Sequence, residues 1–438
     1  MRYDPLRDLP APAGWQPGDV LVVFGELFGR GYANGIVDEA RKAGMTLVGA
    51  TVGRRDGSDG PLRPLNPEEL AAAEANLGGR IVNVPLEAGF DLESVGGGPS
   101  PVEQLKRVKG DNWRELSFDQ AALAASRAAG AARFEQNAAA FAEALAGLVP
   151  PGASLLIVHT MAGGVPRARS LLPLMTRLFR GTGEKHLASG PVWDTELGRL
   201  WASSFEEVTA RTFQRLVAAT APLRTAGRRV RYVAYGYHGC EVMIGGRLTW
   251  QSYTPYLQGW AKKQLEQHAE EAWRDGVRAT VFNCPEIWTN SSALFSGVEL
   301  SLYPLLDAIG DAGRAQGGAA QLAADALRAR GRALLKDGAT LEAMLERAGR
   351  FLSDPVLAPF RGLEAWPHHS TREEMELMLP AAEEVLAFSA DQKNTVAGEL
   401  SRMVFGAVGR LMLAEAWEPS SPVRWLGHDV VARRLVTE

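Results

Sequence analysis

Two tyrosines stand just ahead of two lysines in the stretch Trp250–Lys263. Thr254 is suited to cap a helix, and Pro255 suits its first position, where a missing N–H does no harm. We therefore expect Tyr253 to lie outside the helix, with its hydroxyl turned toward a ligand, and Lys262 to lie within it. A phenol beside an ammonium group is a proton donor whose charged form is favoured. This pair suits the reduction or isomerisation of a carbonyl compound.

A glycine-rich turn follows the apolar run 19–24 and precedes an amphipathic segment at 36–43. Glycines let the backbone approach a pyrophosphate, whose charge is stabilised by the N–H groups of the following helix. The spacing is Gly-x3-Gly-x-Gly rather than the dinucleotide fingerprint G-x-G-x-x-G, so a plain tight turn is the alternative. The glycines are Gly25, Gly29 and Gly31.

The second apolar run at 46–52 is closed by Gly53-Arg54-Arg55-Asp56, so arginines stand where an NAD enzyme would have an acidic residue. Arg54 and Arg55 come after that run, and Arg30 lies inside the glycine turn. An acidic residue here would hold the ribose hydroxyls of NAD, whereas guanidinium groups match a 2′-phosphate. We therefore expect NADP(H) as the cofactor, with NAD(H) as the alternative. Solvated loop arginines are the simpler interpretation of the same residues.

Small and polar residues follow the later strands, where ligands bind in open parallel sheets. The small residues after His159 would admit a cofactor's ribose, while His159 itself is expected to be packed or hydrogen-bonded rather than catalytic. Tyr237 follows the fifth strand and places a second phenol on the same rim as Tyr253. Pro285 ends the sixth strand, and Thr289 offers a donor for a carboxamide or a phosphate. The residues after the fourth strand are Thr160, Ala162 and Gly163.

Strands alternate with helices over the first part of the chain. Continuous apolar runs of this kind are typical of strands covered on both faces. The runs lie at 19–24, 46–52, 80–85, 154–159, 229–235 and 276–282. The alternation predicts an α/β fold with a doubly wound parallel, Rossmann-like sheet in residues 1–313. Only helices are predicted beyond it, so residues 314–438 are expected to form an all-helical C-terminal extension packed on the sheet domain.

Composition narrows the classes of protein and partner. The chain has 438 residues, 46% of them hydrophobic and 22% charged, which is ample for a globular core. A net charge of -4 argues against nucleic acid as a partner. Two cysteines indicate a reducing compartment, and with scattered histidines they do not predict a metal site. No apolar run reaches the roughly 20 residues of a membrane span, and the charged, proline-broken start is not a signal peptide, so we expect a cytoplasmic protein.

The order of these parts resembles the short-chain dehydrogenase/reductase superfamily, and within it the enoyl-acyl-carrier-protein reductase branch. The likeness covers roughly residues 19–298. It rests on the glycine spacing, Gly35-Ile36, Tyr237-x-Gly239-x-Glu241, Tyr253-x8-Lys262, Gly259-x-Ala261-Lys262 and Pro285-x3-Thr289. The Tyr-x8-Lys interval resembles that of the long, monomeric trans-2-enoyl reductases, and we expect a monomer or dimer. A competing pair, Tyr256 and Lys263, has the Tyr-x6-Lys interval of the shorter tetrameric reductases.

The resemblance implies hydride transfer from NADPH or NADH to the β-carbon of a 2-enoyl thioester, carried on coenzyme A or on acyl carrier protein. It implies that Tyr253 meets the developing enolate oxygen, Lys262 binds the nicotinamide ribose and Tyr237 relays a proton. Ile287 and Thr289 match positions that hold the carboxamide and the pyrophosphate side.

Two other functions stay open at the level of the sequence. A carbonyl reductase or alcohol dehydrogenase would keep the fold and the cofactor, but a single Tyr–Lys pair suffices for ketone reduction. The second tyrosine therefore favours enoyl reduction. A catalytically silent nucleotide-binding regulatory protein would retain the site without turnover, and the intact tyrosines and lysine speak against it.

Overall fold

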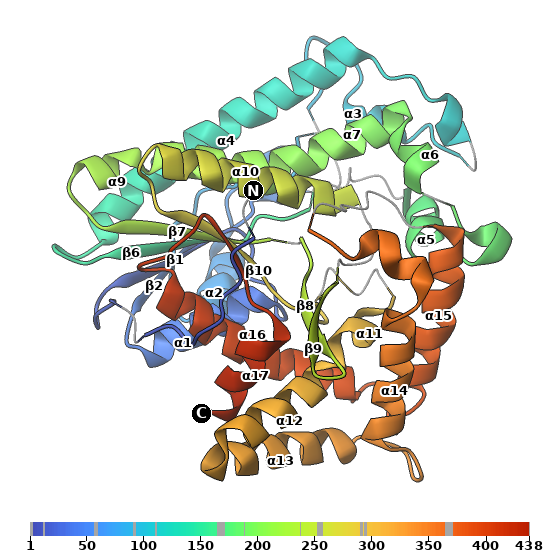
Figure 1. The fold of residues 1–438 in the computed structure, drawn as a ribbon. Helices are drawn as coiled ribbons and strands as arrows, with labels where there is room; N and C mark the ends of the chain where they lie inside the picture. The colour runs from blue at the N-terminus through green and yellow to red at the C-terminus, as the bar shows by residue number, and fades with distance from the viewer. Residues whose placement is uncertain are drawn as a thin grey trace.

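Seven parallel strands form the central sheet of the computed structural model (Figure 1). The structure describes residues 3–11, 14–56, 60–90, 93–109, 112–163, 171–187, 189–236, 238–251, 257–289, 292, 296–363 and 371–437. The strands of the sheet are β1 (Val20–Phe24), β2 (Thr46–Ala50), β5 (Arg80–Ile81), β6 (Leu155–His159), β7 (Val230–Tyr235), β10 (Ala279–Asn283) and β11 (Val423–Trp425). Their order is β11-β10-β7-β6-β1-β2-β5, so the strand order reverses between β1 and β6. Ligands bind at such a reversal in doubly wound sheets.

Helices cover both faces of the sheet (Figure 1). One face packs against α4 (Gln120–Leu148), α8 (Thr212–Ala219), α9 (Ala221–Thr225) and α10 (Leu257–Arg274), whereas α7 (Glu196–Phe205) belongs to a separate hydrophobic cluster. The other face packs against α1 (Tyr32–Lys42), α2 (Pro67–Leu77), α12 (Leu305–Gln316), α16 (Val396–Glu415) and α17 (His428–Val436). Strands β1 and β6 are buried along their whole length, which explains their continuous apolar runs, and His159 at the end of β6 is the polar exception. A π-helical turn, Glu206–Arg211, lies between α7 and α8.

Further strands and helices lie outside these two layers. They are β3 (Arg54–Arg55), β4 (Leu62–Arg63), α3 (Pro101–Leu105), α5 (Leu172–Arg180), α6 (Ser189–Trp193), α11 (Val298–Leu302), α13 (Gly318–Arg332), α14 (Leu341–Leu352) and α15 (Arg372–Leu386). Within the described ranges, no helix combines the length and apolar character needed to cross a membrane.

The predicted fold class is confirmed, with one amendment to the C-terminal extension. The extension is not helical throughout, because it also supplies β11, which pairs in parallel with β10. A strand of three residues carries too little periodicity to be recognised in a sequence. Helix α12 runs across the boundary expected between residues 313 and 314, and that division into two domains stays a prediction.

Two glycines bring α1 and α16 into backbone contact, and Figure 1 shows α16 beside α1 below the sheet. A Cβ atom at Gly35 would lie 1.8 Å from the carbonyl oxygen of Phe405, and one at Gly409 would lie 2.3 Å from the carbonyl carbon of Gly35. No larger residue fits at this crossing. The extension is therefore packed against the first crossover helix of the sheet.

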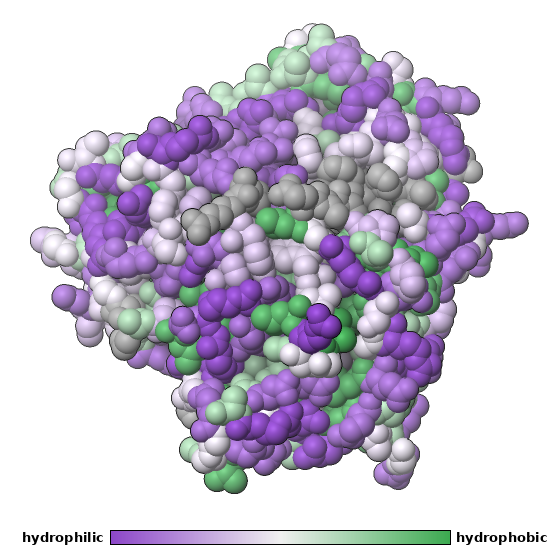
Figure 2. Space-filling view, viewed as in Figure 1, coloured by the Kyte–Doolittle hydropathy of each residue, from purple (hydrophilic) through white to green (hydrophobic). Residues whose placement is uncertain are grey.

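An antiparallel hairpin, not expected from the sequence, follows β7. Its strands are β8 (Cys240–Ile244) and β9 (Arg247–Gln251), joined by two glycines with positive φ that suit the turn of a two-residue hairpin. Figure 2 shows a largely hydrophilic face with apolar residues gathered near this hairpin, whose tip meets Pro304 and Leu345 in a groove. In the register of this hairpin, Cys240 pairs with Gln251. The hairpin thus begins after residue 237 and returns the chain to residues 252–256.

Candidate active site

The glycine turn begins where β1 and β6 end side by side. Gly25 has φ +124°, and a Cβ atom there would lie 2.6 Å from Oγ1 of Thr160 and 2.8 Å from the backbone nitrogen of Met161. Glycine is therefore required for the chain to turn here. The N–H of Thr160 donates to the carbonyl oxygen of Phe24 at 2.9 Å, which fixes the two strand ends together.

The rest of the glycine turn leads into an 11-residue helix, α1. Gly29 and Arg30 are exposed, and Gly31 is the residue before the first turn. Free N–H groups at the start of such a helix suit a pyrophosphate. Across the strand reversal, Ala162 is exposed, and the carbonyl oxygen of Gly163 accepts a hydrogen bond from Thr209 at 3.1 Å. These residues fit a dinucleotide laid across the ends of β1 and β6.

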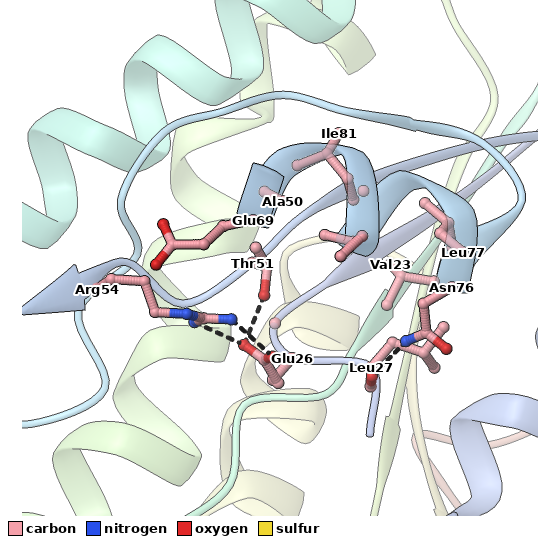
Figure 3. Close-up of a pocket in the computed structure, with 14 residues that line it drawn as sticks. Val23, Glu26, Leu27, Ala50, Thr51, Arg54, Glu69, Asn76, Leu77 and Ile81 are labelled. Carbon is pink, nitrogen blue, oxygen red and sulfur yellow. Dashed lines mark hydrogen bonds and ion pairs between the residues drawn. The ribbon is translucent and has the colours of Figure 1, made fainter. Parts of the chain in front are cut away.

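A cavity of about 300 Å³ lies between the ends of β1 and β2 and helix α2 (Figure 3). The carboxylate of Glu26 faces it and accepts a hydrogen bond from Oγ1 of Thr51 at 2.6 Å. Arg54 donates to the same carboxylate at 3.1 and 3.2 Å. Glu26 directly follows Gly25, so a carboxylate from the turn after β1 lies beside the end of β2.

Two of the three arginines expected to bind a 2′-phosphate, Arg54 and Arg55, are already paired with carboxylates, while Arg30 is exposed. Arg54 is held by Glu26, as described above. Arg55 donates two hydrogen bonds to Glu87, at 2.9 and 3.0 Å, and only 5% of its side chain is exposed. Arg133 donates to the same carboxylate at 2.6 Å. Acidic residues distant in the sequence therefore engage the guanidinium groups of both Arg54 and Arg55, and Arg55 is in addition shielded from any phosphate by its burial.

Lys262 and Lys263 point to different surroundings. Lys262 is buried, and its Nζ donates to the carbonyl oxygen of Tyr235, the last residue of β7, at 2.7 Å. Burial lowers the pKa of Lys262 to about 8, although nearby Cys284 and Glu266 act in the opposite direction. Nζ of Lys263 instead lies 6.0 Å from the ring centre of Trp260. Of the two lysines, Lys262 is the one at the carboxyl edge of the sheet.

Tyrosine side chains connect the first helix with the end of β10. The ring of Tyr32 stacks on that of Tyr235 at 5.7 Å, and its hydroxyl donates to the carbonyl oxygen of Pro285. The Tyr235 hydroxyl is buried without a hydrogen-bond partner among the described residues. Burial raises the pKa of Tyr32 and Tyr235 well above the usual value, so both stay neutral phenols. Pro285 is thereby fixed against the start of α1.

The segment after β10 is folded on itself. Ile287 is buried, and its carbonyl oxygen accepts from Oγ of Ser292 at 2.9 Å. Thr289 donates its backbone N–H to the same hydroxyl at 2.7 Å, and Ser292 donates its own N–H to Oγ1 of Thr289 at 3.0 Å. This closed turn holds Thr289 at the edge of the sheet where β10 ends.

The two tyrosines expected to be catalytic, Tyr253 and Tyr237, lie outside the described residues, as do Tyr256, Thr254 and Pro255. The described elements next to these residues in the sequence are β7, the β8–β9 hairpin and α10. His159 is buried as expected, with Nε2 placed 2.9 Å from Oγ1 of Thr212, and its pKa is lowered by burial.

Several residues at this edge escaped the sequence reasoning. Glu26 stands next to Gly25 in the sequence, and this adjacency could have indicated it. Glu266 stands four residues after Lys262, a helical spacing that places both on one face of the helix. His238 and Asn283 meet Glu266 only through the fold, at 3.0 and 2.7 Å.

The comparisons with known proteins agree with one another, and they cover nearly the whole chain. A family profile for the enoyl-acyl carrier protein reductase FabMG matches residues 2–435. An apo structure of FabMG, described as belonging to novel types of enoyl-acyl carrier protein reductase, is 45% identical, has a TM-score of 0.93, and the match covers 99% of this chain and 97% of that one. An NADH-bound structure of FabMG is 37% identical, with a TM-score of 0.80 and coverage of 99% and 98%. No curated protein sequence matches significantly. The chain belongs to the FabMG family of enoyl-acyl carrier protein reductases.

Proposed function

We propose that this enoyl-acyl carrier protein reductase uses Lys262 as the ribose anchor, Tyr253 as the phenol that meets the enolate oxygen, and Tyr237 as a proton relay. The observation that carries the proposal is the position of Lys262, buried on α10 and fixed by the carbonyl oxygen of Tyr235 at 2.7 Å. An ammonium group at the end of β7 lies on the rim where parallel sheets bind ligands.

The chain's own residues have distinct tasks in the reduction of a trans-2-enoyl thioester. When bound, the nicotinamide cofactor supplies the hydride. The crossing of Gly25 and Thr160 and the start of α1 would receive the pyrophosphate. Lys262 would donate to the nicotinamide ribose. A hydrogen bond from Tyr253 would stabilise negative charge on the thioester oxygen as the β-carbon is reduced, and Tyr237 would deliver the proton that the product needs.

We further propose NADH, rather than NADPH, as the preferred reductant. The Glu26 carboxylate faces the cavity at the end of β2, where it would accept hydrogen bonds from ribose hydroxyls and repel a 2′-phosphate. Arg54 is engaged by Glu26, and Arg55 is buried against Glu87. The related FabMG structure that holds NADH supports the same choice.

One assay tests the residue roles. Purified protein is mixed with NADH and a crotonyl thioester on acyl carrier protein, and loss of the reduced-nicotinamide absorbance is followed. Removing a positioned proton donor lowers rates by about 10²–10⁴-fold, so Tyr253→Phe should lose most activity. Tyr256→Phe and Lys263→Met are the matched controls and should stay close to wild type. The reverse pattern would transfer the roles to Tyr256 and Lys263.

A further inference from the structure

Three buried polar side chains form a closed ring beside the end of β7. The carboxyl group of Glu266 on α10 accepts from Nδ2 of Asn283 at 2.7 Å and lies 3.0 Å from Nδ1 of His238. Asn283 closes the ring, because its Oδ1 accepts the backbone N–H of His238 at 2.6 Å. A buried polar group left without a partner is strongly destabilising, so each member of the ring depends on the other two.

The hydrogens of the ring follow from the acceptors around His238. Its Nε2 lies 2.8 Å from the carbonyl oxygen of Leu363. A carbonyl oxygen only accepts, so Nε2 carries a hydrogen and donates it. The contact between Nδ1 and Glu266 then needs a second hydrogen, carried by the imidazole or by the carboxyl group. His238 is therefore held at both nitrogens as well as at its backbone.

The ring and strand β10 fix both neighbours of Tyr237 in the sequence. A Cβ atom on Gly236 would lie 2.3 Å from Oδ1 of Asn283, and the N–H of Gly236 donates to the carbonyl oxygen of Phe282 at 2.8 Å. Tyr237 stands between Gly236 and His238 in the sequence. Both flanks of Tyr237 are thus bound to β10, and one of them also to α10.

The ring is also connected to the element that carries Lys262. Glu266 follows Lys262 by four residues, about one helical turn, on α10. Lys262 donates to the carbonyl oxygen of Tyr235, the last residue of β7. The imidazole of His238 meanwhile lies 6.1 Å from the ring of Trp250 at the end of β9. The lysine and the ring therefore share one rigid set of contacts.

We infer that Glu266, Asn283 and His238 are positioning residues for enoyl reduction, which hold Gly236 and His238, the two neighbours of Tyr237, at a fixed place relative to Lys262. The inference rests on the proposed roles of Tyr237 and Lys262. None of the three ring residues needs to touch the substrate, because their effect is on the distance between the phenol and the reacting thioester. A misplacement of about 1 Å lowers rates by roughly 10²-fold.

Two substitutions at Glu266 separate the geometry of the ring from its charge. A glutamine can accept from Asn283 with its oxygen and donate to a neutral Nδ1 of His238 with its nitrogen, whereas an alanine breaks both contacts. With rates expressed per NADH-binding site, Glu266→Ala should lower kcat at least about tenfold, with a smaller change in KM for the enoyl thioester. Glu266→Gln should restore most of the rate. Equal losses in both variants would overturn the inference.

A double-mutant cycle tests whether the ring acts through Tyr237. Glu266→Ala should lower kcat much less in a Tyr237→Phe background than in wild type, because interacting residues are not additive. An equal loss in both backgrounds would overturn the inference. A Tyr237→Phe variant with wild-type kcat would instead overturn the proposed role of Tyr237. Because this variant leaves Glu266, Asn283 and His238 unchanged, its result is distinct from a failure of the ring.

The same helix provides a matched control for loss of a His–Glu pair. His268 and Glu271 form a pair at 3.0 Å near the surface of α10. Glu271→Ala removes that pair but leaves the ring untouched, and its kcat should stay at the wild-type value. A loss in Glu271→Ala as large as in Glu266→Ala would also count against a positioning role, since any weakening of α10 would then explain both.

Discussion

Lys262 donates a hydrogen bond to the carbonyl oxygen of Tyr235 at 2.7 Å while the protein shields its ammonium group from water. The hydrogen bond fixes the side chain, and the lost hydration disfavours its charge, so the pKa of Lys262 falls from 10.5 to about 8. The proposed ribose anchor is therefore a cation whose charge is lost within an accessible pH range.

The pH dependence of turnover should report this group. If charged Lys262 is needed to bind the cofactor, kcat/KM should fall as the pH rises through about 8, since that profile follows groups of the free enzyme. The measurement is kcat/KM for NADH between about pH 6 and pH 10 at saturating thioester. A profile that stays level to the upper end of this range would rule out the assignment.

Stability should respond to the same pKa with a defined sign. The folded-state pKa of Lys262 lies below its unfolded value, so the unfolded chain binds more protons between about pH 8 and pH 10.5, and stability rises with pH in that window. Below pH 8 the penalty for the buried charge is fully present. Lys262→Met should then be more stable than wild type at neutral pH, by on the order of 3 kcal/mol.

Urea unfolding of wild type and Lys262→Met at neutral and alkaline pH measures this difference. The advantage of the variant should shrink as the pH rises, while its activity stays low throughout. Lys263→Met, which removes a lysine near the Trp260 ring, should show no such pH-dependent gain. A Lys262→Met protein less stable than wild type at neutral pH would contradict the predicted burial penalty.

Cofactor choice should depend on Glu26. Glu26→Gln removes the carboxylate that would repel a 2′-phosphate and releases Arg54 to bind it, so both effects favour NADPH. We expect the ratio of the Kd values to shift toward NADPH by about tenfold, equivalent to roughly 1.4 kcal/mol. Fluorescence titration with each nucleotide gives the ratio, and exposed Asp38→Asn on α1 is the control. An unchanged ratio would remove Glu26 from cofactor selection.

Arg55 should matter for folding rather than for the 2′-phosphate. Its guanidinium and Arg133 share the buried carboxylate of Glu87. Breaking a buried ion pair from one side costs about 3–5 kcal/mol, so Arg55→Ala should lower the free energy of unfolding by this order. NADH and NADPH affinities of the folded protein should change by the same factor. A selective loss of NADPH binding would restore the role expected from the sequence.

The contact between α1 and α16 should tolerate no side chain at Gly35. A Cβ atom there would overlap the carbonyl oxygen of Phe405 at 1.8 Å, and overpacking costs about 1–3 kcal/mol or more. Gly35→Ala should therefore lower the unfolding free energy. Gly147→Ala, in exposed and open space near the end of α4, should raise it by up to about 1 kcal/mol through helix propensity. Equal effects of the two alanines would contradict the close packing.

Much of the architecture was predictable because strands buried on both faces leave continuous apolar runs. All six predicted strands of the sheet are present, and enoyl-acyl carrier protein reduction, expected from the motif resemblance, is confirmed by the family. The β8–β9 hairpin escaped prediction because β9 is mostly not buried and leaves no continuous apolar run, and β11 escaped because a strand of three residues carries little periodicity.

The electrostatics at the edge of the sheet were less predictable, because the charged partners come from distant parts of the sequence. Arg54 and Arg55 looked open to a phosphate, yet Glu26 and Glu87 hold them. Local spacing did place Lys262 inside a helix, as the structure has it. The roles of Tyr253 and Tyr237 stay predictions.

The position of β11 in the chain affects how the enzyme is made. Strand β10 supports the ring through Asn283, and within the described ranges its outer edge is paired by β11 alone, at Val423–Trp425. Those residues emerge from the ribosome roughly 140 residues after β10, which at about 5–20 residues per second is on the order of ten seconds or more. During that interval β10 is an open strand edge, the kind of surface that pairs with other chains. Nascent chains stalled before β11 should therefore be the aggregation-prone and chaperone-bound species of this enzyme.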